Sequence, residues 1–178
     1  MQQLISREEV IKKVHEVTGE VLSTMLGLEA KPEAVYTESQ HGRADGVVSF
    51  AGFAGPQCVG TGSMQCDSKV ACTLASQFLM SDYKSIDDEV LDAFGELTNM
   101  VIGNFKTSLE DQMGQMGLSI PTVVYGKNFS TRSPGNEEWL VIPFSWGDDK
   151  LFIRVCLKEK ESDQAVHAGK KQEFVLQN

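Results

Sequence analysis

The longest amphipathic pattern in the chain runs from Asp87 to Met116 and predicts one long helix. At about 100° per residue, apolar residues spaced by three and four fall on one side of this helix, which is therefore its buried side. They are Val90, Phe94, Leu97, Val101, Phe105 and Ser108 or Leu109. On the opposite side, steps of four, three and four keep four further side chains in line. We call these four residues the polar stripe: Asp92, Glu96, Asn99 and Gly103.

The composition of the polar stripe differs from that of an ordinary solvated helix face. Such faces are rich in Lys and Glu, whereas Asn and Gly in mid-helix cost about 0.5 and about 1 kcal/mol relative to Ala. Each residue alone has a simple interpretation: Glu96 as a solvated side chain, Asp92 as a partner of the helix dipole, and Asn99 as a neutral surface residue. Their alignment on one face favours a functional surface.

Helical periodicity predicts two further helices. Ser6 followed three residues later by Glu9 forms a capping-box pattern, and the helix after it continues to Gly27. Its repeating apolar residues are Val10, Val14, Val17, Val21 and Met25. Asp67 or Ser68 caps another helix from about Lys69 to Met80. Its apolar side consists of Val70, Leu74 and Phe78.

Strand signals occupy most of the remaining chain. Gly117 closes the turn after the long helix, and Pro121 begins the next strand, a position that proline tolerates. The last two strands are expected to pair as an antiparallel hairpin around a turn at 147–149, and residues 128–138 form a polar loop. The expected strands are residues 34–37, 46–50, 58–64, 121–126, 139–144 and 151–157.

Length and composition indicate one domain. With 178 residues, 41% of them apolar, the chain can bury one ordinary core, which we place in residues 1–160, followed by a polar, poorly ordered tail at 161–178. The excess of 25 acidic over 16 basic residues argues against nucleic-acid binding. No apolar run approaches the roughly 20 residues that cross a bilayer, and the first residues do not resemble a signal peptide. We therefore expect a cytoplasmic protein with no membrane contact.

Cysteines and glycines have plain structural interpretations. Cys58, Cys66, Cys72 and Cys156 include no C-x-x-C pair, which favours buried structural thiols over a metal or redox role. The glycine-rich segment 52–64 has no following G-K-[ST] and lacks the third glycine of a dinucleotide-binding pattern. A hairpin with close approach at its glycines is the better interpretation.

A weak internal repeat relates two helices. GEVLSTMLG at 19–27 aligns with GELTNMVIG at 95–103, so that Glu20 matches Glu96 and Ser23 matches Asn99. The match suggests two related halves around a pseudo-twofold axis, although nine residues can also match by chance between amphipathic helices. The expected fold is a single α+β domain in which long helices pack on an antiparallel β-sheet, with this helix-plus-strands repeat.

The pattern Asp92-x-x-x-Glu96-x-x-Asn99, followed by Pro121, resembles the signature of the CheX and CheC family of chemotaxis phosphatases. Twenty-one residues separate Asn99 from Pro121, one fewer than in the family pattern. The segments GELTNMVIGN and GLSIPTVVYG are also similar to CheX, and the resemblance extends over roughly residues 6–158. It implies the CheC/CheX-like fold and a homodimer.

The resemblance also implies an activity, which is hydrolysis of the aspartyl phosphate on a response-regulator receiver domain such as CheY. In this interpretation Glu96 pairs with the receiver's lysine and Asn99 orients the attacking water, while Asp92 and Gly103 belong to the partner-binding surface. No cofactor or metal is expected on this chain, because the receiver supplies the divalent metal, Mg²⁺. Because Ser23 replaces the amide in the first half, one site per chain is expected. The alternative is a non-catalytic CheX-like module that binds a receiver or a flagellar switch component.

Overall fold

The computed structural model describes residues 5–38, 43–131 and 138–160, which combine helices with one large antiparallel sheet. Within these residues the helices are α1 (Arg7–Leu26), α2 (Ser68–Leu79) and α3 (Asp88–Met113). The strands are β1 (Lys31–Pro32), β2 (Tyr36–Glu38), β3 (Arg43–Ala54), β4 (Cys58–Cys66), β5 (Gly117–Leu118), β6 (Thr122–Ser130), β7 (Trp139–Trp146) and β8 (Asp149–Glu159).

The strands form an eight-stranded antiparallel sheet in the order β1-β7-β8-β4-β3-β5, with β2 also on β7 and β6 also on β3. From the sequence, an expected homodimer could use either an exposed strand edge of the terminal hairpin or a helix face, and the sheet order rules out the first. Strand β8 lies at the centre against β4, and β7 is covered by β1 and β2. The edges belong instead to the short strands β1 and β2 on one side and to β5 and β6 on the other.

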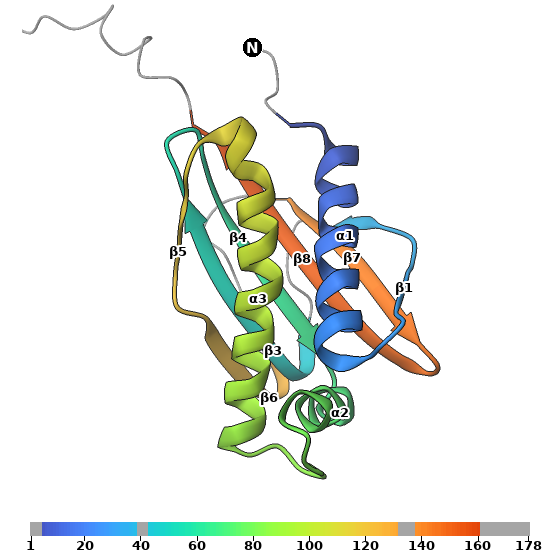
Figure 1. Ribbon diagram of the computed structural model, residues 1–178. Coiled ribbons are helices and arrows are strands. Elements are labelled where there is room, and N and C mark those ends of the chain that lie inside the picture. Colours follow the sequence, from blue (N-terminus) through green and yellow to red (C-terminus); the bar gives the residue numbers. More distant parts are fainter. Residues whose placement is uncertain (1–4, 39–42, 132–137, 161–178) are drawn as a thin grey trace, which may run out of the picture.

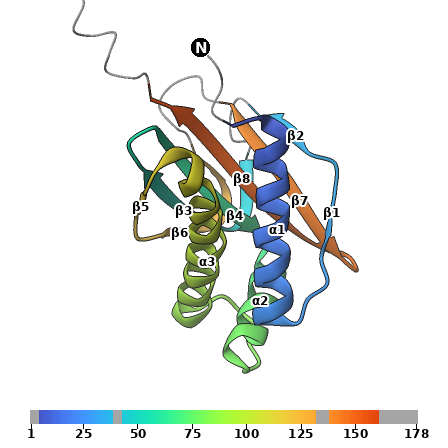
Figure 2. The same cartoon turned by 45° about the horizontal axis from the view of Figure 1, so that its top comes forward.

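Helices α1 and α3 lie side by side across one face of the sheet, and α2 packs at one end of this layer (Figure 1). The turned view shows the same two-layer arrangement (Figure 2). The core between the layers holds most of the apolar residues predicted for the three helices. Phe94 and Phe105 from α3 are both fully buried in it. None of the helices in the described residues is long and apolar enough to cross a membrane.

Local sequence signals account for the helix ends. Ser6, Asp67 and Asp87 each accept a backbone N–H of the first turn, at 3.1, 2.8 and 2.9 Å, which satisfies donors that the helix itself leaves unpaired. The long helix ends at Met113, with Gly114 after it at φ 77°, so Gly117 does not close it as predicted. Gly117 begins β5 instead.

Several other details differ from the sequence-based expectation. Met25 is 43% exposed rather than part of the core, although it lies on the apolar side, because it is in the last turn of the helix. Strand β6 continues through residues 128–130, which were expected to be loop, and β8 extends to Glu159. The rest of that loop at 132–137 and the predicted tail at 161–178 lie outside the described residues.

Glycine in β4 permits the close approach of helix and sheet. A Cβ at Gly62 would lie 2.4 Å from Ile102 Cδ1 of α3, and one at Gly60 would lie 2.4 Å from the Phe53 ring. The hairpin interpretation of the glycine-rich segment is therefore confirmed, since β3 and β4 pair from Val47↔Cys66 to Ala54↔Val59.

The register of the sheet relates the two halves of the chain. Ala51 pairs with Gly62 in the first hairpin, and Ile142 pairs with Ile153 in the second. Residues of β3 and β4 therefore match residues of β7 and β8 that lie the same number of positions further along the chain. Between the hairpins, β4 and β8 run antiparallel at the centre of the sheet. This arrangement confirms the predicted pseudo-twofold repeat.

The edge strands follow the same symmetry but cross between the halves. Tyr36 of β2 pairs with Val141 of the second half, and Thr122 of β6 pairs with Phe50 of the first half. Each half therefore completes its sheet with strands from the other.

Candidate functional site

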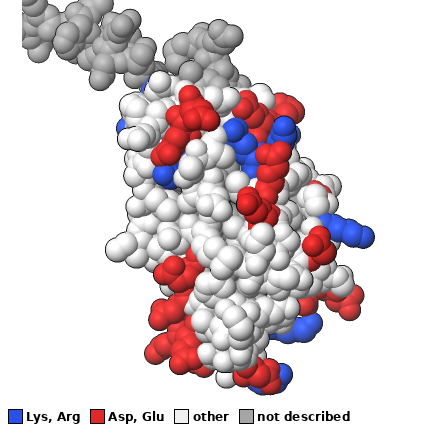
Figure 3. Space-filling view, viewed as in Figure 1, with Lys and Arg blue, Asp and Glu red and all other residues white. Residues whose placement is uncertain are grey.

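The polar stripe lies on the outer side of α3. Asp92 and Glu96 are exposed, and Asn99 and Gly103 are half-buried. The apolar side predicted from the helical period is buried opposite the stripe, with Leu109 rather than Ser108 as its last member. Acidic side chains gather over the N-terminal half of α3 at the lower left of Figure 3. On this helix they are Asp88, Glu89, Asp92 and Glu96.

A chain segment returns along one flank of the stripe, and we call residues 117–121 the flanking segment. Leu118 Cδ2 lies 3.3 Å from the position of a Cβ on Gly103. Further along, Pro121 Cγ lies 3.9 Å from the same position on Gly95. The segment thus runs antiparallel to α3, from the level of Gly103 back to the level of Gly95. In Figure 1 it descends beside α3 from the label β5.

Asn99 lies on the same flank of α3 as Gly103, next to the flanking segment. At about 100° per residue it lies between Gly95 and Gly103 around the helix as well as along its axis. Both glycines lie beside the segment, so the helix position of Asn99 is on the same flank. This position agrees with its half-buried state and leaves Glu96 further out on the exposed side. The structure therefore brings Pro121, distant in sequence, close to the stripe.

An ion pair near the end of α3 holds the start of the flanking segment. Lys106 Nζ lies 2.7 Å from Glu110 Oε1, and it donates to the carbonyl oxygen of Met116 at 3.1 Å. Glu110 in turn accepts the backbone N–H of Met116 at 2.9 Å. The hydrogen bond from Lys106, followed by that from Met116, lowers the pKa of Glu110 below its ordinary value. These contacts fix the turn that leads into β5.

The functional groups of the stripe are uncommitted. Across residues 5–38, 43–131 and 138–160, no hydrogen bond or ion pair engages the side chain of Asp92, Glu96 or Asn99. The matching turn of α1 is different, because the hydroxyl groups of Ser23 and Thr24 both donate to the carbonyl oxygen of Glu20, at 3.2 and 2.6 Å. A carboxylate and an amide at the surface can each form hydrogen bonds with a docked partner.

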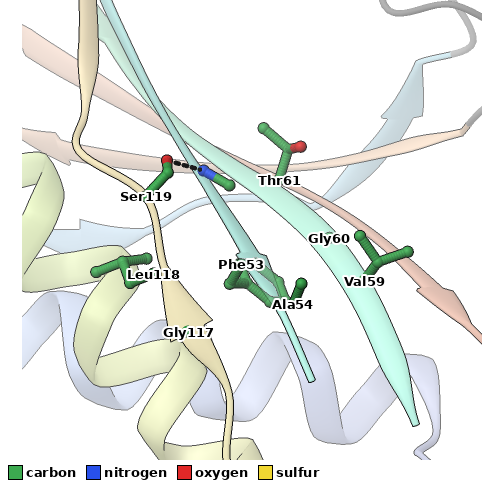
Figure 4. Close-up of a pocket in the computed structure, with 9 residues that line it drawn as sticks. Phe53, Ala54, Val59, Gly60, Thr61, Gly117, Leu118 and Ser119 are labelled. Atoms are coloured by element: carbon green, nitrogen blue, oxygen red, sulfur yellow. Dashed lines mark hydrogen bonds between the residues drawn. The ribbon is translucent and has the colours of Figure 1, made fainter. Parts of the chain in front are cut away.

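A shallow hollow of about 440 Å³ lies beside the flanking segment (Figure 4). It is lined by backbone and small or apolar side chains of β3, β4 and β5, with Val59, Thr61 and Ser119 among them. None of its lining residues carries an ionisable side chain, so the hollow offers no acid–base group. Ser119 Oγ accepts the backbone N–H of Gly52 at 2.9 Å, as the dashed line in Figure 4 shows.

The cysteines and the possible metal ligands were also compared with the position of the stripe. All four cysteines are buried, as predicted, and none of them forms a disulfide. Burial raises the pKa of Cys66 well above its ordinary value. Among the described residues, no group of three or more His, Cys, Asp or Glu side chains could hold a metal ion. The stripe is a surface of the described structure where unpaired polar side chains are aligned on one helix face.

The fold and the stripe together define the class of protein: an α+β domain with the CheC/CheX-like arrangement of helices on an antiparallel sheet. The chain belongs to the family described as chemotaxis phosphatase CheX, whose model matches residues 47–145. This match includes α3 with the whole polar stripe, the flanking segment and Pro121. A search of curated proteins found no significant match.

Solved structures support the same assignment. A CheC-like superfamily protein from Shewanella sp. PV-4 has 29% identity and a TM-score of 0.76, over 86% of this chain and 99% of that one. Chemotaxis protein CheX from Vibrio vulnificus has 29% identity and a TM-score of 0.74, over 84% and 99%. CheX from Borrelia burgdorferi, solved in a complex with CheY, BeF₃ and Mg²⁺, has 26% identity and a TM-score of 0.73, over 86% and 100%.

Sequence reasoning identified the stripe but not its surroundings. The i, i+4 spacing of Lys106 and Glu110 is a readable signal for an ion pair on a helix. The hydrogen bonds of both side chains with the Met116 backbone cannot be predicted from the sequence, because they depend on how the chain turns after Gly114. Nothing in the sequence indicated that Ile120 of the flanking segment is 89% exposed.

Proposed function

We propose that this protein hydrolyses the aspartyl phosphate of a CheY-like receiver domain, using Glu96 and Asn99. Three facts support the proposal: the chain belongs to a family of chemotaxis phosphatases, the Borrelia burgdorferi relative was solved bound to CheY, and the stripe side chains have no partners among the described residues. The observation that carries it is the half-buried Asn99, held beside the flanking segment with its amide uncommitted.

Hydrolysis of the aspartyl phosphate requires few catalytic groups from this protein. An acyl phosphate is already reactive, and the receiver contributes the phosphorylated Asp, a lysine and the metal ion. Water attacks phosphorus, the bond from phosphorus to the Asp oxygen breaks, and the products are the free carboxylate and inorganic phosphate, with the water protons passing to phosphate or solvent. The Asn99 amide holds the water in line with the breaking bond. An amide does not titrate near neutral pH, so Asn99 acts by orientation and hydrogen bonding.

The other stripe residues hold the partner. Glu96 pairs with the receiver's lysine, for which its exposed, unpaired carboxylate is suited. Gly103, without a side chain, allows close approach one turn beyond Asn99, and Asp92 completes the acidic side of the contact. The metal, Mg²⁺, is bound by the receiver, and this chain needs no cofactor.

One site per chain follows from the differences between the halves. Ser23 stands at the place of Asn99, and its hydroxyl bonds to its own helix. The sheet register aligns Tyr36 with Thr122, so Val35 stands at the place of Pro121. The first half therefore retains Glu20 but lacks both the amide and the proline.

The same proposal includes a homodimer in the cytoplasm. The family resemblance motivates the dimer, and the outer strands β5 and β6 at one edge of the sheet offer a surface for it. Sedimentation over a range of protein concentrations measures the mass, and a monomer throughout would contradict the homodimer.

The test follows the decay of a phosphorylated CheY-like receiver from the same organism, with and without this protein. Wild type should accelerate decay at substoichiometric amounts. Asn99→Ala should lower kcat by about 10²–10³-fold, the loss expected for one well-placed hydrogen-bonding group in the transition state. Asn99→Asp is a useful companion because it keeps the shape of the side chain but adds a charge beside the phosphoryl group.

Two results would contradict the proposal. If no receiver of the organism decays faster in the presence of wild type, the chain is not a phosphatase. If wild type binds a receiver tightly without accelerating decay, the non-catalytic binding module becomes the better description.

A further inference from the structure

Ile120 is an exposed apolar side chain in a position where the fold allows it little freedom. Its exposed fraction is 89%, although isoleucine belongs to the residues most often found in protein cores. It lies in the flanking segment between Leu118, which is beside Gly103, and Pro121, which is beside Gly95. Asn99 lies between the same two glycines, so Ile120 stands at the level of Asn99 along α3.

The backbone around Ile120 is fixed on both sides. The Ser119 N–H donates to Gly52 O at 2.8 Å, and the Gly52 N–H donates to Ser119 Oγ at 2.9 Å, which ties the segment to β3 by two reciprocal bonds. The Ser119 hydroxyl also donates to the Ile120 carbonyl oxygen at 3.1 Å. Pro121 restricts the residue before it to extended conformations. Ile120 is thus presented outward on a rigid support.

We propose that Ile120 is a receiver-binding residue of the site, which packs against an apolar side chain on the receiver beside its phosphorylated Asp. This inference rests on the proposed function, since the receiver reaches Ile120 only when it docks on the polar stripe. A partner seated on Glu96 and Asn99 covers the neighbouring flank as well. Buried apolar anchors at the centre of an interface carry much of its binding energy, and a fixed backbone lowers the entropy lost on binding.

The role assigned to Ile120 differs from that of Asn99. Asn99 acts on the water in the transition state, so its loss lowers kcat. Ile120 contacts the receiver equally in the ground state and the transition state, and its loss therefore raises KM with kcat unchanged. In the same assay, loss of Asn99 should therefore change kcat, and loss of Ile120 should change KM.

The experiment measures binding and turnover for Ile120→Ser. Binding is measured by calorimetry to a CheY-like receiver loaded with beryllofluoride and Mg²⁺, and turnover by decay of the phosphorylated receiver. Ile120→Ser should weaken binding about tenfold and raise KM by a similar factor, while kcat stays within about twofold of wild type. Ile120→Val, which keeps most of the apolar surface, should restore binding to near the wild-type value.

Val59→Ser is the matched control. Val59 is also an exposed β-branched residue, at 40%, but it alternates with Gly60 and Gly62, which face the core and α3, so it lies on the opposite face of the sheet. Its substitution should leave the Kd and KM unchanged. Equal melting temperatures of the variants and wild type exclude misfolding as the cause.

The outcomes separate the two proposals. An unchanged Kd for Ile120→Ser overturns the role of Ile120, whether or not wild type speeds decay. If wild type binds the loaded receiver without speeding decay, the phosphatase proposal fails, and a weakened Kd for Ile120→Ser still supports the contact. If wild type does not bind the receiver at all, both are wrong.

Discussion

Glu96 and Glu20 occupy matching places on the two long helices, and both are exposed carboxylates. The residues one turn further on distinguish them, because Asn99 is free to meet a partner whereas the Ser23 hydroxyl is bonded to Glu20 O. Glu96→Ala should therefore raise KM for a phosphorylated receiver by about tenfold or more, through loss of a charged contact with the partner lysine. Glu20→Ala should leave kcat and KM near wild type. Steady-state kinetics at equal protein concentration compare the two.

A large loss in Glu20→Ala would mean that the first half also works, and the one-site proposal would then fail. Glu96→Gln is a further control for charge, since it keeps the size of the side chain. The KM of Glu96→Gln should lie between those of wild type and Glu96→Ala.

For individual residues, the sequence predicted which side chains share a helix face but not which residues of other segments lie beside them. The alignment of Glu96 and Asn99 follows from the helical period alone. The approach of Pro121 and Ile120 depends on a turn after Gly114 and on hydrogen bonds between Ser119 and β3. Such contacts are set by the tertiary fold, so no local pattern reports them.

Helix α3 sits close to the sheet because β4 has no side chain where the two meet. A Cβ at Gly62 would lie 2.4 Å from Ile102 Cδ1, and Ile102 is itself buried with little room to move. Gly62→Ala should therefore lower the free energy of unfolding by about 1–3 kcal/mol, as overpacking of a core does. Urea unfolding followed by circular dichroism measures the change.

Gly19→Ala is the opposite case and serves as the control. No atom lies within 4 Å of a Cβ at Gly19, which is in the interior of α1. Alanine should stabilise the protein there by about 0.5–1 kcal/mol, because it reduces the freedom of the unfolded chain and favours helix. Equal destabilisation by both substitutions would contradict the role of Gly62 as a contact point.

The contact of Glu110 with Lys106 and Met116 gives the end of α3 a pH dependence. Because these hydrogen bonds lower the pKa of Glu110 in the folded state, its contribution to stability is fully present above the pKa of the unfolded chain. That contribution is lost as pH falls through the folded-state pKa. Glu110→Gln should thus lower the melting temperature at pH 7, and the gap from wild type should shrink at about pH 3.

Glu16→Gln supplies the comparison for this effect. Glu16 pairs with Lys12 at 3.8 Å on an exposed part of α1, and such pairs contribute little to stability. Its substitution should change the melting temperature only slightly at either pH. A gap for Glu110→Gln that stays constant between the two pH values would contradict the assigned ion pair.

Among the elements, helix boundaries were more predictable than strand pairing. The caps at Ser6 and at Asp67 were predicted from local signals, and the helix expected from Asp87 begins at Asp88 with Asp87 as its cap. Strand neighbours are a long-range property. The sequence therefore left open whether the terminal hairpin lies at an edge, whereas in the structure β8 pairs with β4 across about half the chain.

At the scale of the whole molecule, the exchange of edge strands makes the two halves one unit. Strands β1 and β2 complete the second hairpin at β7, whereas β5 and β6 complete the first at β3, and the hairpins join through β4 and β8. The internal repeat indicated two related halves, but a nine-residue match carries no information on which half supplies each edge strand.

This exchange predicts a single cooperative unfolding transition. Both tryptophans, Trp139 and Trp146, lie in β7 of the second half, so their fluorescence reports on a strand whose edge partners come from the first half. Helices α1 and α3, one from each half, dominate the far-ultraviolet circular dichroism. Because neither half buries its sheet edges alone, the urea midpoints from the two probes should coincide. A fluorescence transition at clearly lower urea than the loss of helix would mean that the halves unfold separately, despite the strands they exchange.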